Sequence, residues 1–80
     1  MPRTLYTPRH KALREFITEK RKAAKLTQAE LAKLVGSYQS FVADFERGER
    51  RLDVVQFLDF AEALEFEPGA AIRKVAKAKR

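Results

Sequence analysis

Residues 26–48, "LTQAELAKLVGSYQSFVADFERG", contain the clearest structural signals in the sequence. It opens with Thr27 and Glu30, spaced as in a capping box, where the hydroxyl and the carboxylate each bind a backbone N–H at the start of a helix. The apolar face of this helix comes from three residues at helical spacing: Leu31, Leu34 and Val35. Gly36 follows at the place where a residue of left-handed conformation ends a helix. The pattern predicts a short helix between Thr27 and Gly36.

A second helix follows after a tight turn, and we expect Ser37 to be its N-cap. An apolar stripe at positions i, i+3, i+4 and i+7 should face inward: Tyr38, Phe41, Val42 and Phe45. The opposite face should display Gln39, Ser40, Ala43, Asp44 and Arg47. Gly48 should end the helix. Two short helices joined through a glycine-containing turn, the second with a polar outer face, indicate a helix-turn-helix arrangement.

Three further helices are predicted around this pair. Thr7 followed by Pro8 is typical of a helix start, and the first helix should end near Ala24. Asp53 caps the fourth helix, whose core face should comprise Leu52, Phe57, Leu58, Ala61 and Leu64. Pro68 opens the fifth, whose thin apolar stripe contains Ile72, Val75 and Ala76. The predicted fold class is therefore all-α, with five helices.

Length, composition and charge restrict the function. Eighty residues make one small domain. The lack of cysteine excludes disulfides, thiolate catalysis and cysteine-bound zinc, and it fits a location in the cytoplasm. No apolar run approaches the roughly 18 residues that a membrane-spanning helix needs. The net charge of +6 is uneven, with +6 over residues 1–25, −5 over residues 26–67 and +5 over residues 68–80. Such asymmetry indicates a polyanionic partner that meets the basic ends.

Several short motifs together resemble a known family. They are Thr27-Gln28, Glu30-Leu31-Ala32, Gly36, Gln39-Ser40 and Glu46-Arg47-Gly48. On them, residues 26–64, about half of the chain, resemble the Xre-type helix-turn-helix family, the small repressors of the phage repressor and Cro superfamily. The resemblance implies a compact five-helix DNA-binding domain that places its third helix in the major groove, usually as a homodimer on a palindromic operator.

On this basis the chain divides into three parts. Residues 1–7 should form an N-terminal arm and residues 8–67 the helix-turn-helix domain. Residues 68–80 should form the fifth helix and a basic tail that serves in dimerisation or contacts the DNA backbone. Four residues are candidates for the dimer surface: Val54, Phe60, Ile72 and Val75.

The resemblance also implies roles for residues of the two central helices. Gln28 matches a position that contacts the DNA backbone and braces the first recognition residue. Gln39 and Ser40 match positions that read base edges, and a glutamine amide suits adenine because it can donate to N7 and accept from the N6 amino group. Tyr38 stands where a small polar residue usually touches phosphate. Further candidates for backbone contact are Arg47, Arg50 and Arg51, then Arg9, Lys11 and Arg14.

Asp44 occupies a groove-facing position where a carboxylate is unusual. It can accept a hydrogen bond from a cytosine or adenine amino group, pair with Arg47 three residues on or stay in solvent, or contact a protein partner. Phe41 also departs from the small residue that is frequent at its position. It is a candidate for contact with a thymine methyl group if it is partly exposed, and Ala43 is a further candidate for DNA contact.

The remaining residues offer no other chemistry. His10 has no second metal ligand and no nucleophile near it in the sequence, so we expect it to be exposed and structurally unimportant. An 80-residue helical domain has little room for a catalytic cleft, so we expect no enzyme activity, no cofactor and no metal. The leading hypothesis is a repressor that binds double-stranded DNA and no membrane. The alternative is an antitoxin-like or bridging module that binds a second protein through the same fold.

Overall fold

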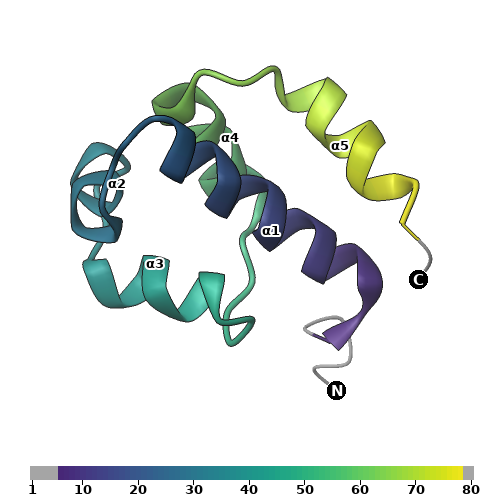
Figure 1. The fold of residues 1–80 in the computed structure, drawn as a ribbon, viewed down its shortest axis with the longest axis horizontal. Coiled ribbons are helices and arrows are strands. Elements are labelled where there is room, and N and C mark those ends of the chain that lie inside the picture. Colours follow the sequence, from purple (N-terminus) through teal and green to yellow (C-terminus); the bar gives the residue numbers. More distant parts are fainter. Residues whose placement is uncertain (1–5, 79–80) are drawn as a thin grey trace.

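The computed structural model describes residues 6–78 and shows five α-helices within them. They are α1 (Pro8–Ala23), α2 (Gln28–Leu34), α3 (Gln39–Glu46), α4 (Val54–Leu64) and α5 (Pro68–Ala76). In Figure 1, α1 crosses the molecule diagonally, with α2 and α3 on one side of it and α5 on the other. Most of the predicted N-terminal arm, residues 1–5, and the last two residues of the basic tail, Lys79 and Arg80, lie outside the described residues.

The helix starts follow local hydrogen bonding, as the sequence predicts. The Thr7 hydroxyl accepts a hydrogen bond from the N–H of His10 at the start of α1. Capping boxes formed by Thr27 with Glu30 and by Asp53 with Gln56 open α2 and α4. Each box satisfies two backbone donors that have no partner within the helix.

The start of α3 differs from the prediction. Tyr38, not Ser37, occupies the N-cap, and no side chain caps the helix. Ser37 belongs to the end of α2, because its N–H donates to the carbonyl of Ala32 (2.8 Å) while the N–H of Gly36 donates to that of Lys33 (3.2 Å). This pair of bonds is a Schellman motif, and it requires the left-handed conformation that Gly36 adopts (φ 71°). Because Ser37 takes part in the end of α2, α3 starts one residue later than predicted.

The core forms where α1, α2, α3 and α4 meet. Its fully buried large side chains are Ile17, Leu31, Val42, Phe45 and Phe60. The ring of Phe60 lies 6.2 Å from that of Phe45 and 6.4 Å from that of Phe41, centroid to centroid. Aromatic pairs at this separation add to the stability that burial of their area provides.

Two predictions about α4 are wrong. Phe60, a candidate for the dimer surface, is only 1% exposed, and Leu58, predicted to face the core, is 47% exposed. The buried stripe of α4 consists of Phe57, Phe60, Ala61 and Leu64, which are spaced at i, i+3, i+4 and i+7. Leu58 lies outside this stripe, on the surface of the helix.

Two predictions about α3 are also wrong. Tyr38, expected on the inward stripe, is 77% exposed, because it precedes the first helical turn. Ala43, expected to face outward, is only 8% exposed. The helix packs against both α1 and α2, so its buried arc is broader than a single stripe. Phe41, Val42 and Phe45 are buried as predicted.

His10 is buried rather than exposed. It is 9% exposed, and its ring meets that of Phe45 edge to face at 5.8 Å, because the first turn of α1 lies over the C-terminal end of α3. Among the described residues, neither ring nitrogen forms a hydrogen bond of good geometry, and the backbone of Arg50 is the polar group that comes near the ring. Burial, with help from the nearby charges of Arg14 and Arg51, lowers the pKa of His10 below its ordinary value, while the backbone of Arg50 opposes this shift.

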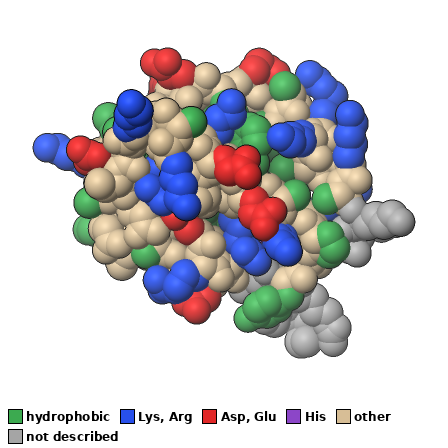
Figure 2. Space-filling view, in the orientation of Figure 1, with side chains coloured by type: hydrophobic (Ala, Val, Ile, Leu, Met, Phe, Trp, Pro, Cys, Tyr) green, Lys and Arg blue, Asp and Glu red, His purple; other side chains and the backbone are tan. Residues whose placement is uncertain are grey.

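The last helix packs along the first. Just before α5, the ring of Phe66 meets that of Phe16 edge to face at 5.0 Å. The Arg9 guanidinium donates to the carbonyl of Ala76, the last residue of α5 (3.0 Å), and to that of Ala78 two residues beyond it (3.3 Å). Figure 2 shows Lys and Arg side chains gathered over α5 and acidic side chains nearer the middle of the same face. Within the part of the chain that the structure describes, no helix is long and apolar enough to cross a membrane.

Candidate nucleic-acid interface

A buried ion pair links α1 to the end of α3. Arg21 donates through Nε and Nη2 to the two carboxylate oxygens of Glu46, at 2.6 and 3.0 Å, and through Nη1 to the carbonyl of Leu26 at 2.8 Å. The two charged side chains are only 11% and 8% exposed. A bidentate pair of this kind fixes both groups in one geometry. It is absent from the predicted site residues, because 25 sequence positions separate the partners and no local spacing indicates their contact.

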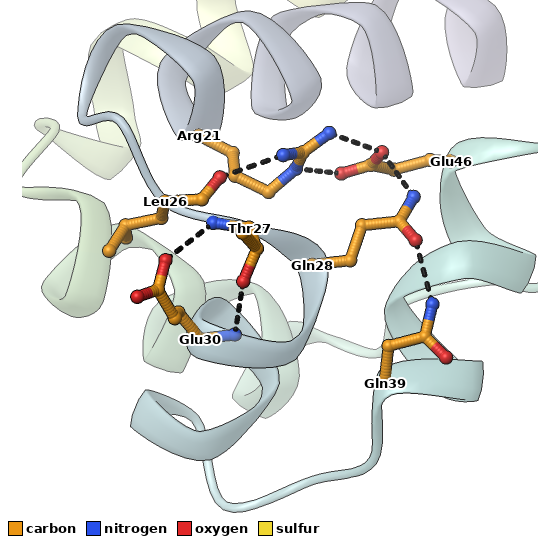
Figure 3. Close-up of polar contacts among 7 residues, drawn as sticks. All are labelled: Arg21, Leu26, Thr27, Gln28, Glu30, Gln39 and Glu46. Carbon is orange, nitrogen blue, oxygen red and sulfur yellow. Dashed lines mark hydrogen bonds and ion pairs between the residues drawn. The ribbon is translucent and has the colours of Figure 1, made fainter.

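Glu46 in turn holds the two glutamines of the helix-turn-helix. Gln28 donates through Nε2 to Glu46 Oε1 (2.9 Å) and accepts at Oε1 from Gln39 Nε2 (2.8 Å). Figure 3 shows the resulting chain, in which Arg21, Glu46, Gln28 and Gln39 follow one another across α1, α3 and α2. Each amide nitrogen carries two hydrogens and each amide oxygen two lone pairs, so both glutamines keep capacity for further partners.

The residues predicted to read DNA lie at the exposed start of α3. Gln39 and Ser40 are exposed, and Tyr38 beside them is exposed as well. Gln28 is half-buried and contacts Gln39, so the structure brings these two predicted site residues together. The oriented amide of Gln39 and the free hydroxyl of Ser40 are groups of the type that hydrogen-bond to base edges.

The other end of α3 carries a cluster of charges. Arg47 forms ion pairs with Asp44 and, at 3.3 Å, with Glu49, so the local pairing considered for Asp44 is present in the free protein. Asp44 is half-buried, and Arg47 is exposed. Arg50 and Arg51 are exposed too, and no carboxylate among residues 6–78 pairs with either.

Phe41 and Ala43 lie beneath this surface. Phe41 is 6% exposed, and the guanidinium of Arg50 stands over its ring at 4.6 Å. Ala43 is buried against the body of the domain. Both were candidates for direct DNA contact, and their burial makes them supports of the surface rather than parts of it.

Comparison with known proteins identifies the family. The helix-turn-helix family model matches residues 17–69, which include the whole of α2, α3 and α4. The chain belongs to the Xre-type helix-turn-helix family. Among solved structures, an XRE-family like protein from Pseudomonas syringae pv. tomato str. DC3000 is 42% identical with a TM-score of 0.81, over 92% of this chain and 90% of that one. No curated protein sequence matches the chain.

Two further solved structures are similar. The restriction-modification controller protein C.AhdI from Aeromonas hydrophila is 37% identical, with a TM-score of 0.69, over 74% of this chain and 86% of that one. The clp gene regulator ClgR from Corynebacterium glutamicum shares the fold alone, at 19% identity and a TM-score of 0.76, over 85% of this chain and 72% of that one. The predicted family and all-α fold are confirmed, and membership of the Xre-type family makes the protein a DNA-binding transcriptional regulator and not an enzyme.

Proposed function

We propose that the protein is a cytoplasmic, sequence-specific repressor that binds a palindromic operator as a homodimer, with α3 in the major groove of each half-site. The observation that carries this proposal is the chain of hydrogen bonds from the buried Arg21–Glu46 pair through Gln28 to Gln39. It orients a reading amide before DNA arrives, so that little side-chain freedom is lost on binding.

Reading of the sequence begins with Gln39. Its Oε1 and second N–H face an adenine with the donor and acceptor that adenine requires, while its first N–H stays on Gln28. Ser40 adds a hydroxyl that suits any base. Asp44 accepts from a cytosine or adenine amino group once a DNA phosphate has taken its place beside Arg47.

Phosphate contacts position α3 without reading the sequence. At the start of α3, the second amide hydrogen of Gln28 and the exposed hydroxyl of Tyr38 donate hydrogen bonds to phosphates of one DNA strand. Arg47, Arg50 and Arg51 serve the backbone at its other end. Their contribution to affinity should fall as salt concentration rises.

The homodimer is proposed to form through an apolar groove of about 460 Å³ between α4 and α5. Its exposed apolar side chains are Val54 (74%), Ile72 (52%) and Leu58 (47%), and Val75 is half-buried on the same helix as Ile72. Asp53 and Arg73 also line the groove. In a two-fold contact, residue i of one copy meets residue j of the other and j meets i, so Asp53 of each copy can pair with Arg73 of the other while the apolar side chains are buried.

Selection of random duplex DNA with the purified 80-residue chain tests the proposal. We expect a palindromic consensus whose half-sites are centred about one helical turn, or 10 base pairs, apart. A pool without consensus would favour the alternative of an antitoxin-like or bridging module that binds a second protein. A reporter whose promoter overlaps the selected operator then separates repression from activation by the sign of the change in expression.

A further inference from the structure

We propose that Phe41 is a positioning residue that holds Arg50 in the conformation in which it binds a DNA phosphate. The inference rests on the proposed DNA-binding function and deepens it, because it assigns a role to Phe41, which is one of the residues by which this chain departs from the family pattern. Phe41 therefore does not contact DNA directly but acts through the neighbouring cation, Arg50.

The position of the Arg50 guanidinium over the Phe41 ring indicates what each side chain does. The Arg50 guanidinium carbon lies 4.6 Å from the centroid of the Phe41 ring, within the range of a cation–π contact. A cation–π contact depends on the charge of the guanidinium, which keeps further N–H groups for hydrogen bonds to another partner. Those groups match the oxygens of a phosphate in a bidentate contact. The ring therefore holds Arg50 without consuming the donors that DNA needs.

The ring itself is fixed from below. Only 6% of Phe41 is exposed, and its ring packs against that of Phe60, which is 1% exposed. An exposed arginine ordinarily loses rotamer freedom when it binds a phosphate, and this loss weakens the contact. A platform that is part of the core reduces that loss before DNA arrives.

The backbone that carries Arg50 is anchored too. The N–H of Gly48 donates to the carbonyl of Phe45 (3.0 Å), and the N–H of Glu49 donates to that of Asp44 (2.8 Å). Gly48 has the left-handed conformation that this helix end requires (φ 84°). The loop therefore leaves α3 in a defined direction, and Arg50 follows two residues after the turn.

The neighbouring arginines differ from Arg50 in their partners. Arg47 is held by Asp44 and Glu49, so a phosphate must compete with two carboxylates for it. Arg51 forms neither an ion pair nor a cation–π contact within residues 6–78. Arg50 thus combines a free charge with a fixed position at this end of α3.

A double-mutant cycle on DNA affinity tests the inference. Phe41→Leu keeps an apolar side chain and removes the ring, Arg50→Ala removes the charge, and the double variant removes both. Affinity is measured for the selected operator and for an unrelated duplex over a series of salt concentrations. Arg51→Ala replaces Arg50→Ala in a matched second cycle, and thermal melting identifies the temperature at which every variant is folded.

We expect Phe41→Leu to weaken binding to both duplexes by about two- to fivefold, the worth of a cation–π contact at an exposed site. The same substitution should have no effect when residue 50 is already alanine, and its full effect when residue 51 is alanine. Arg50→Ala should lower the salt slope by about one and leave the ratio between the two duplexes unchanged.

Other results overturn the inference. Equal effects of Phe41→Leu in both cycles would show that the ring acts through the core and not through Arg50. An unchanged affinity for Phe41→Leu would show that Arg50 needs no platform. If the wild-type chain selects no sequence and binds no duplex, the proposed function fails together with this inference, whereas a binding wild type with additive variants leaves the function standing.

Discussion

The surface at the start of α3 is polar, whereas the groove between α4 and α5 is apolar. At the first, Gln28 and Gln39 are linked to each other and to the buried Arg21–Glu46 pair. At the second, Val54, Leu58 and Ile72 expose between 47% and 74% of their area to solvent. Hydrogen bonds within the protein orient the polar groups of the first surface. The apolar groups of the second surface remain in contact with water.

The two surfaces are suited to different kinds of contact. Reading of bases needs donors and acceptors at defined positions, which hydrogen bonds to a buried ion pair provide. Assembly needs apolar area that becomes buried, and its energy depends little on the direction of individual groups. A change at the first surface should therefore alter fold stability or sequence preference, whereas a change at the second should alter the oligomeric state.

Glu46→Ala should have the largest effect, because it leaves the charge of Arg21 and the amide of Gln28 without their partner. We expect the free energy of unfolding to fall by about 3 to 5 kcal/mol, as for the loss of one member of a buried pair. Urea denaturation measures it. Glu49→Ala, which removes an exposed carboxylate, is the control and should change stability by less than about 0.5 kcal/mol.

The double variant Arg21→Met with Glu46→Leu sharpens this test. Replacing a buried ion pair with apolar side chains of similar size is often neutral for stability. We expect the double variant to be folded and yet to lose sequence preference, since Gln28 and Gln39 are no longer oriented. Full preference in the double variant would show that the glutamines orient themselves.

Ile72→Glu tests the groove. Ile72 is 52% exposed in the single chain, so the fold should survive, but burial of the new carboxylate across a two-fold axis is unfavourable. We expect the dimer dissociation constant in sedimentation equilibrium to rise at least about thirtyfold, the effect of losing a hot spot of 2 kcal/mol. Leu34→Glu, at a 60% exposed position on α2, is the control and should sediment as the wild type does.

Gln39→Ala tests the reading role of the polar surface. We expect discrimination at one base pair of each half-site to fall by about 1 to 3 kcal/mol, with the other positions unchanged. Competition of single-base-pair operator variants against the labelled operator measures this. Loss of affinity for every duplex, with all preferences intact, would instead make Gln39 a brace for Gln28.

The ring of His10 is buried against Phe45, and the pH dependence of stability tests the effect of this burial. Burial lowers its pKa below the ordinary value of 6.5, so the unfolded chain binds the proton more readily. This group therefore leaves stability unchanged well above pH 6.5 and reduces it as the pH falls through 6.5 toward the folded-state pKa. The slope from one group cannot exceed about 1.4 kcal/mol per pH unit.

Urea denaturation of the wild type and of His10→Leu at about pH 7.5 and pH 5.5 isolates this contribution, because only the titrating residue differs between the two chains. The wild type should lose more stability than the variant between the two conditions. Equal losses would show that the ring accepts a proton in place without cost.

Local chemistry made much of the fold predictable. Thr27 with Glu30 and Asp53 with Gln56 satisfy backbone donors within four residues, so the sequence contains the whole interaction. Gly36 and Gly48 lie at two of the positions where the backbone is left-handed, although Lys25 and Glu65 adopt this conformation as well. The motifs around them were specific enough to indicate the family, which the helix-turn-helix model confirms over residues 17–69.

Burial and long-range pairing were less predictable. The exposure of Leu58 and the burial of Ala43 depend on which neighbours cover each side of a helix, and periodicity alone does not specify those neighbours. The pairing of Arg21 with Glu46 depends on the crossing of α1 over α3. His10 was predicted to be exposed because its position in the sequence does not reveal that Phe45 packs against it.

Asp44→Ala should have the smallest effect on the fold, because an exposed ion pair three residues apart stabilises a helix by only about 0.2 to 0.5 kcal/mol. Its effect on DNA separates two roles. A carboxylate that reads an amino group should, when removed, relax preference at one base pair and leave the salt slope unchanged, and this is the expected result. Glu49→Ala frees Arg47 from its second carboxylate without changing the groove-facing side of α3, so it should tighten binding to all duplexes alike. If Asp44→Ala behaves as Glu49→Ala does, Asp44 only restrains Arg47, and base reading is confined to the start of the helix.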